Sequence, residues 1–248
     1  STMKSLTRNE TAAFLQQHDH YAIVTHRRPD GDTIGSSALL CLGLRQLGKT
    51  AHILRNPEIT PKYASLHQGL TKESAEPGDT VVTVDVASEN MLPSLFAALP
   101  FSLRIDHHGT AASFTPYELV EPKVAACGEI VYGVLREMGV SLDVPMAEAL
   151  YTAVSTDTGC FRYSNVTPRT MIMGAEMIEK DPDLIKYRDI ALGHHKFYNG
   201  DGGYPVFFET ILSSAWDGKT DKKPRGEGTQ ENPFLISTKS FIALYFAK

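Results

Sequence analysis

A short apolar run that leads directly into a histidine, two aspartates and two glycines constrains this chain most. The segment is IVTHRRPDGDTIGS, residues 23–36, and it places His26, Asp30 and Asp32 just after a strand-like run. Gly31 and Gly35 permit a tight backbone path while the polar side chains converge. Imidazole and carboxylate ligands suit Mn²⁺, Mg²⁺ or Zn²⁺, and the excess of carboxylates favours the harder ions. The segment predicts a metal site, with manganese as the first candidate, although an ordinary PDGD turn beside a strand-end histidine would show the same residues.

Three further segments place acidic or imidazole groups at the end of an apolar run. TVVTVD ends in Asp85, SLRIDHHG contains Asp106, His107 and His108, and ALYTAVSTDTG places Asp157 after a helix-like stretch. A single aspartate at a strand end is usually a turn former or a helix cap. Four such clusters in one chain are better explained by one shared site.

Strand and helix signals alternate along the chain and predict a parallel α/β sheet flanked by helices. Thr7 with Glu10 forms a capping-box pattern at the start of the first helix. Polar groups at the carboxyl ends of parallel strands match the usual position of ligands in open α/β folds. We expect strands at 21–25, 51–55, 80–85 and 102–105, and helices at 7–17, 33–47, 128–138, 146–155 and 168–180.

The four segments together resemble the DHH phosphoesterases, a family named for the triplet seen here at residues 106–108. The pattern HxxPDGDxxGS is matched in full by residues 26–36, and TDTGxFRYSNxTPRT by residues 156–170. The resemblance covers about residues 5–195 and implies two divalent cations, Mn²⁺ above Mg²⁺ or another ion. The first cation would be held by His26, Asp30 and Asp85, the second by Asp32, His107 and Asp157, with Asp85 bridging the two.

The same resemblance implies hydrolysis by a water that two close cations activate. His108 would then contact the substrate phosphate or protonate the leaving group, and Asp106 would orient an imidazole. Ser36 and Ser37 would offer donors to phosphate, unless they are simple helix-start serines. Arg162 would reach the phosphate, unless it only pairs with a nearby carboxylate.

The resemblance also implies a class of substrates. It implies hydrolysis of phosphoester bonds in short oligonucleotides, dinucleotides or 3′-phosphoadenosine 5′-phosphate. Two alternatives stay open: a manganese-dependent pyrophosphatase or exopolyphosphatase with the same metals, and a nucleotide-binding module without catalytic activity.

Composition and charge narrow the class of partner. The chain has 248 residues, of which 42% are hydrophobic, and a net charge of −5. A negative balance argues against long duplex nucleic acid, which needs a basic footprint, and leaves small anionic substrates and a homodimer open. Three scattered cysteines, no signal peptide and no apolar run of about 18 residues predict a cytoplasmic protein that does not cross a membrane.

The C-terminal part does not follow the resemblance. Family members that cut oligonucleotides usually carry a second domain with a GGGH-like segment, and the sequence after about Glu209 has none. We expect a metal-binding domain at residues 1–190, and at 191–248 a polar linker with a truncated, replaced or divergent segment. No role is assigned to the remaining histidines, which are His18, His20, His52, His67, His194 and His195.

Overall fold

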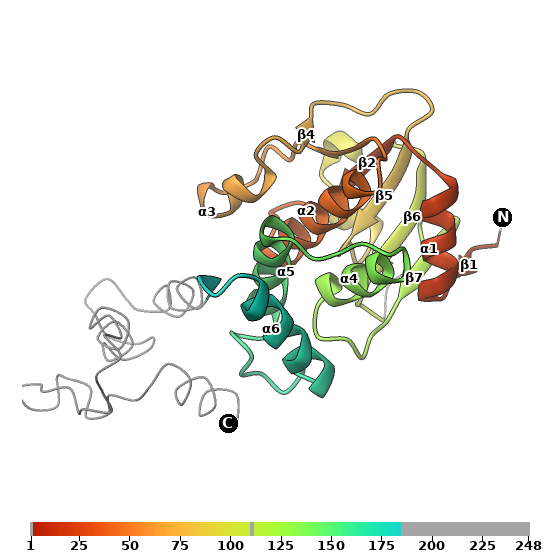
Figure 1. Ribbon diagram of the computed structural model, residues 1–248. Coiled ribbons are helices and arrows are strands. Elements are labelled where there is room, and N and C mark those ends of the chain that lie inside the picture. The colour runs from red at the N-terminus through yellow and green to blue at the C-terminus, as the bar shows by residue number, and fades with distance from the viewer. Residues whose placement is uncertain (1, 110–111, 185–248) are drawn as a thin grey trace, which may run out of the picture.

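A seven-stranded sheet forms the centre of the computed structural model, which describes residues 2–109 and 112–184 (Figure 1). The strand order is β1-β7-β6-β5-β2-β3-β4, and every neighbouring pair is parallel. The parallel α/β architecture predicted from the sequence is therefore confirmed. The strands are β1 (Lys4–Ser5), β2 (Tyr21–Val24), β3 (Ala51–Leu54), β4 (Thr71–Lys72), β5 (Thr80–Val84), β6 (Phe101–Asp106) and β7 (Tyr117–Val120).

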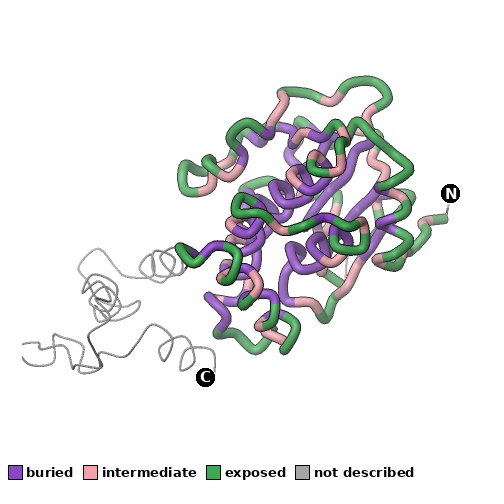
Figure 2. Tube along the Cα trace, viewed as in Figure 1, coloured by how far each residue is buried: buried purple, intermediate pink, exposed green. Residues whose placement is uncertain are grey.

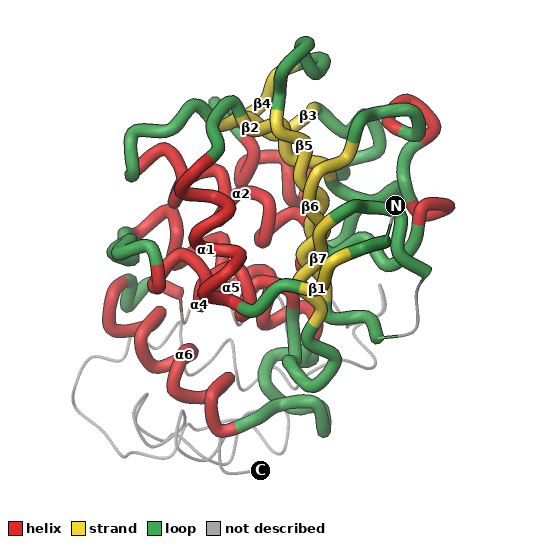
Figure 3. Tube along the Cα trace, turned by 90° about the vertical axis from the view of Figure 1, so that its right-hand side faces the viewer, coloured by secondary structure: helices red, strands yellow, loops and turns green. Residues whose placement is uncertain are grey.

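The longer helices lie on one face of the sheet, and loops with short helical turns cover the other face (Figure 3). Both faces are buried, so alternate residues of β2 enter different cores: Tyr21 and Ile23 pack on the helical side, Ala22 and Val24 on the other. The helices are α1 (Arg8–Gln17), α2 (Gly31–Gln46), α3 (Pro61–Ala64), η1 (Ser65–His67), η2 (Glu89–Met91), η3 (Ser94–Phe96), α4 (Cys127–Glu137), α5 (Val144–Asp157) and α6 (Pro168–Lys180).

All of the expected strands and helices are present, with ends that differ by a few residues. The Thr7 capping box at the start of α1 is formed as expected. The sequence did not predict β1, β4, β7 or the short helices α3 and η1 to η3.

Helix α2 is buried along most of its length and runs beside the sheet through the middle of the molecule (Figure 2). The sequence analysis placed Gly31 and Gly35 in a tight turn, but both lie inside this helix. A Cβ atom at Gly35 would lie 2.3 Å from the carbonyl oxygen of Ala149 in α5, and one at Gly31 would lie 2.3 Å from Cγ2 of Thr156. The two glycines therefore allow α5 to approach α2 closely.

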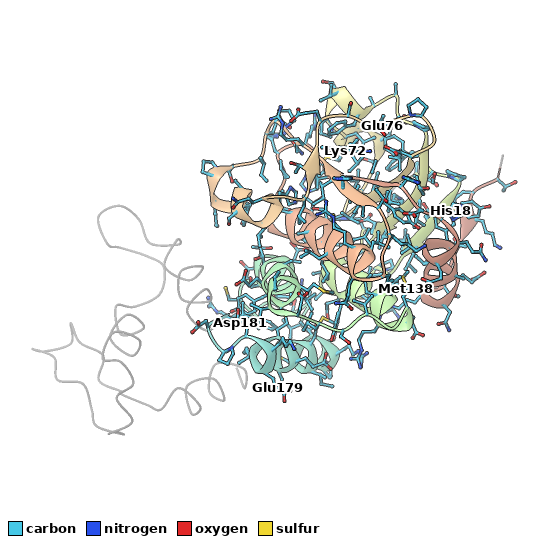
Figure 4. The ribbon with its side chains drawn as sticks, turned by 45° about the horizontal axis from the view of Figure 1, so that its top comes forward. His18, Lys72, Glu76, Met138, Glu179 and Asp181 are labelled. Atoms are coloured by element: carbon cyan, nitrogen blue, oxygen red, sulfur yellow. The ribbon has the colours of Figure 1, made fainter. Side chains whose placement is uncertain are left out.

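Several expectations concern peripheral parts of the chain. His18 follows the end of α1, where its ring stacks on Phe14 at 4.1 Å (Figure 4). His194, His195 and the proposed segment 191–248 lie outside the described residues, and the boundary near residue 190 stays a prediction. Within residues 2–109 and 112–184, no helix is long and apolar enough to cross a membrane.

Candidate metal centre

Carboxylates and imidazoles converge where three neighbouring strands end. β6, β5 and β2 are adjacent in the sheet, and they are followed by His107, Asp85 and His26 respectively. Asp30 is the N-cap of α2, and Asp157 is the last residue of α5. Because α2 and α5 pack closely at Gly31 and Gly35, their polar ends meet at the same edge of the sheet.

The first group of potential ligands is formed by His26, Asp30 and Asp85. Nε2 of His26 lies 3.4 Å from Oδ1 of Asp30 and 3.8 Å from Oδ2 of Asp85. These ligand atoms all lie within 4.8 Å of one another. The structure thus brings together the three residues that the family resemblance assigns to one cation.

The second group is formed by Asp32, His107 and Asp157. Nε2 of His107 lies 3.4 Å from Oδ2 of Asp32, 3.2 Å from Oδ2 of Asp157 and 3.3 Å from Oδ1 of Asp85. Asp85 therefore directs one oxygen towards His107 and the other towards His26, as a bridging carboxylate would. His108 joins Asp85 and His107 in a third possible set of ligand atoms.

Each histidine of the two groups is fixed through its other ring nitrogen. Nδ1 of His26 lies 2.8 Å from the carbonyl oxygen of Arg27, and Nδ1 of His107 lies 3.1 Å from that of Val124. A carbonyl oxygen only accepts hydrogen bonds, so Nδ1 carries a proton in both rings. Nε2 is then the atom that can coordinate a metal ion, which is the usual arrangement of a metal-binding histidine.

Unpartnered polar atoms mark the point between the two groups. Among the described residues, three buried side-chain atoms have no hydrogen-bond partner: Oγ1 of Thr83, and Oδ1 of Asp85 and Nε2 of His107, which lie where the two groups meet. Such atoms are rare in folded proteins, and a missing ion is one of their standard explanations. Four carboxylates also converge here, so two divalent cations would balance their charge.

Protons take up part of this negative charge when no cation is bound. Burial raises the pKa of Asp85 to about 6, and burial together with Asp85 and Asp157 raises the pKa of Asp32 well above its ordinary value. Burial alone would lower the pKa of His107, but the Asp157 and Asp85 carboxylates outweigh it and raise this pKa to about 11. The site binds positive charge, and its residues fit a divalent metal centre.

The N-terminus of α4 supports Asp32. Oδ2 of Asp32 accepts a hydrogen bond from the backbone N–H of Cys127 at 2.8 Å, and Oδ1 accepts one from Gly128 at 3.0 Å. Ser36 is fully buried and donates its hydroxyl to Oδ1 of Asp32 at 2.9 Å. The Ser36 hydroxyl is thus committed to Asp32 and turned away from solvent in this structure, and a donor role of Ser36 towards substrate phosphate stays a prediction. Ser37 donates to the carbonyl oxygen of Ile34 and also contacts His67.

Asp106 links a buried arginine to His108. Oδ2 of Asp106 accepts from Arg104 at 2.8 Å, and its Oδ1 lies 2.7 Å from Nδ1 of His108. Arg104 is 1% exposed and also donates to Glu118 at 2.9 Å. The imidazole that Asp106 orients is thus that of His108, while His107 is held by the Val124 carbonyl. The hydrogen bond and charge of Asp106 raise the pKa of His108 above its ordinary value.

A left-handed turn follows Asp157 and reverses the chain. Gly159, Cys160 and Phe161 have φ angles of +55°, +57° and +65°, a conformation that non-glycine residues rarely adopt. The carbonyl oxygen of Thr158 accepts hydrogen bonds from the backbone N–H groups of residues 162 and 163. Arg162 lies on this turn, where it is exposed and close in sequence to Asp157.

Sequence reasoning missed the groups that orient the ligands. Several of these groups are backbone atoms, namely the carbonyls of Arg27 and Val124 and the N–H groups at the start of α4. No residue type in the sequence predicts where backbone atoms of this kind will lie. Arg104 could have been predicted, because it is a charged residue in an apolar strand. It stands two positions before Asp106 and therefore points to the same face of the sheet.

Curated relatives resemble two thirds or more of this chain. The bifunctional oligoribonuclease and PAP phosphatase NrnA of Thermus thermophilus is 35% identical over 172 residues, which are 67% of this chain and 52% of the relative. The protein of the same description from Mycoplasma pneumoniae is 27% identical over 86% of this chain and 70% of its own length. The chain spans about half the length of the Thermus protein.

A solved structure shows the same fold. The exopolyphosphatase-related protein from Bacteroides fragilis superimposes with a TM-score of 0.59 at 22% identity, over 84% of this chain and 63% of that one. At the level of protein families, the model of the DHH family, N-terminal domain, matches residues 20–154. That match includes five of the six residues in the first and second groups, and Asp157 follows it by three residues. The chain belongs to the DHH family.

Proposed function

We propose that this chain holds two divalent cations, with Mn²⁺ preferred, and hydrolyses phosphoester bonds by a metal-activated water. The observation that carries the proposal is the pair of ligand groups that meet at Asp85, each with a histidine fixed through Nδ1. His26, Asp30 and Asp85 would hold one cation, and Asp32, His107 and Asp157 the other. Two such cations lower the pKa of a water molecule and neutralise the charge that develops on a phosphoryl group.

The proposed substrates are short oligonucleotides, dinucleotides and 3′-phosphoadenosine 5′-phosphate. The activities named for the curated relatives support this class. The net charge of −5 supports a small substrate over long duplex nucleic acid. The phosphate would enter from the open side of the centre, where the side chains of Asp30 and His108 are 56% and 46% exposed.

His108 is the proposed proton donor. Its Nδ1 is bound by Asp106, so Nε2 is the ring atom left for the substrate. The Asp106 carboxylate at Nδ1 would stabilise the imidazolium form of His108, in which Nε2 donates to a phosphoryl oxygen or to the leaving oxygen. Asp106 is a positioning residue for this ring, and Arg104 holds Asp106.

Two further residues have proposed supporting roles. Arg162, exposed on the turn after Asp157, would contact the substrate phosphate. Ser36 would support the metal centre through its hydrogen bond to Asp32.

The proposal is tested by incubating the protein with 5′-phosphorylated diadenylate in Mn²⁺ and measuring the release of AMP by chromatography. We expect release that a chelator abolishes and that an Asp157→Asn variant loses. A panel with 3′-phosphoadenosine 5′-phosphate and inorganic pyrophosphate separates the nucleotide substrates from the pyrophosphatase alternative. Nucleotide binding in Mn²⁺ without turnover of any of these substrates would contradict catalysis and support a binding module.

A further inference from the structure

A pocket of about 400 Å³ adjoins the metal centre on its open side. Asp30 and Asp157, one from each group of potential ligands, form part of its wall, so the pocket borders the proposed metal centre. Its volume lies within the range of about 300–1,000 Å³ that is usual for small-molecule sites. The rest of the wall combines aromatic and aliphatic side chains with polar and charged ones: Tyr63, Leu66, Tyr151 and Tyr163 belong to the first kind, and Thr152, Ser155, Lys62 and Glu148 to the second.

Tyr163 has the features of a stacking surface. A Cβ atom at Gly159 would lie 2.4–2.8 Å from three atoms of the Tyr163 ring, so the ring lies directly against the glycine backbone. The same side chain is nevertheless 56% exposed. Tyr163 and Asp157 line the same pocket, and only glycine at position 159 allows the ring to approach the backbone this closely.

The opposite side of the pocket comes from the segment of α3 and η1. Tyr63 is half-buried there, and Nζ of Lys62 lies 5.1 Å from the centre of its ring. The pocket thus joins aromatic side chains, a cationic group and the carboxylates of the metal centre. A ligand with an aromatic ring at one end and a phosphate at the other matches this order of groups.

We propose that this pocket binds the base and sugar of a nucleotide whose phosphate lies at the metal centre, with the base stacked on Tyr163. The inference rests on the proposed function and adds to it the residues that recognise the nucleoside. Every base has a stacking face, so the site would require an aromatic base without selecting one sequence. Binding energy from the nucleoside would hold the phosphate in position for hydrolysis.

Calorimetry with AMP and with ribose 5-phosphate, both in Mn²⁺, tests the pocket without requiring turnover. We expect the wild type to bind AMP more tightly than ribose 5-phosphate, and Tyr163→Ala to lose most of this preference. Stacking on an aromatic side chain is worth about 1–3 kcal/mol, so AMP affinity should fall about 5-fold to about 150-fold while ribose 5-phosphate changes little. Tyr163→Phe should keep the preference.

Matched variants control for general effects. Tyr117 is also an exposed tyrosine, 37% exposed, but it lies on β7 and contacts Phe14 instead of the pocket. Tyr117→Ala should leave both affinities unchanged. Tyr63→Ala, on the opposite wall, should weaken AMP binding in the same direction as Tyr163→Ala.

The outcomes separate this inference from the proposed function. A wild type that binds AMP no better than ribose 5-phosphate, or a Tyr163→Ala variant that keeps the wild-type preference, would overturn the pocket assignment even if diadenylate is hydrolysed. A preference lost in Tyr163→Ala, combined with no hydrolysis of diadenylate, would support the pocket and contradict the catalytic proposal.

Discussion

Asp85 combines burial, an unusual backbone angle and a position between the two ligand groups. It is 3% exposed and has a φ of +60°, which asparagine and aspartate tolerate better than other non-glycine residues. Its ionised form is unfavourable in the metal-free protein, because burial raises its pKa to about 6. Asp85 therefore lowers the stability of the folded protein without metal, and a bound cation would offset this cost by balancing its charge.

Asp85→Asn should consequently have opposite effects with and without metal. At pH 8 in a chelator we expect the variant to be more stable than the wild type by roughly 3 kcal/mol, because the buried charge is removed. In saturating Mn²⁺ the variant should be less stable than the wild type and inactive. Urea unfolding in both conditions measures this, and a variant that is less stable in both would show that Asp85 has a purely structural role.

His67 provides a second test at the residue scale. It is buried near Ser37 and the Ile34 carbonyl, and burial lowers its pKa to about 4. The unfolded chain binds a proton at this residue below about pH 6.5 and the folded chain does not, so stability falls as the pH decreases from about 6.5 to about 4. Between pH 7 and pH 5 the loss from this residue should be roughly 2 kcal/mol.

Urea unfolding of the wild type and of His67→Gln at these two pH values measures how much His67 contributes to the loss of stability on acidification. The variant should lose less stability than the wild type on acidification, although it is less stable at pH 7. Equal losses in the two proteins would show that His67 takes up its proton in the folded state.

The packing of α2 against α5 sets the distance between Asp32 and Asp157. Gly35→Ala would place a Cβ atom 2.3 Å from the backbone oxygen of Ala149, so one helix must move. We expect a loss of about 2 kcal/mol in stability and weaker Mn²⁺ binding, because the two ligands lie at the ends of the displaced helices.

Gly43→Ala is the matched control on the same helix. There the new Cβ atom would approach Cδ1 of Leu135 at 2.5 Å, and this flexible side chain can rotate away. We expect little change in Mn²⁺ affinity measured by calorimetry. Similar losses of Mn²⁺ affinity in both variants would argue that α2 transmits any disturbance, wherever it occurs.

Element by element, the sequence was most informative where the hydrophobic pattern was long. YAIV and TVVTV are continuous apolar runs that only a buried parallel strand explains well, and β2 and β5 follow them closely. β1 and β4 have two residues each and form because a neighbouring strand offers its edge, so no local pattern announces them. The ligand side chains were visible in the sequence, whereas their supports are mostly backbone groups brought together by tertiary packing.

For the molecule as a whole, cation binding, proton release and folding are linked. Bound metal requires His107 without its Nε2 proton, while the metal-free folded protein keeps that proton up to about pH 11. Mn²⁺ affinity should therefore rise about tenfold per pH unit for each proton released. The stabilisation by Mn²⁺ should grow by about 1.4 kcal/mol over the same interval.

Unfolding experiments with fixed Mn²⁺ and with chelator, at pH 6.5 and pH 7.5, measure this difference directly. Calorimetry of Mn²⁺ binding in two buffers of different ionisation enthalpy counts the protons. A metal affinity that is the same at both pH values would contradict the charge balance described for the site.

The two outermost strands of the sheet have a consequence for how copies of this chain can associate. β1 and β4 expose only two residues each to the outside of the sheet. Long, flat edge strands are templates for pairing between chains and for aggregation, and very short ones are a common protection against both. Among the described residues, this arrangement disfavours a continuous sheet formed across two copies through β1 or β4, so a dimer should not form by pairing of these edges.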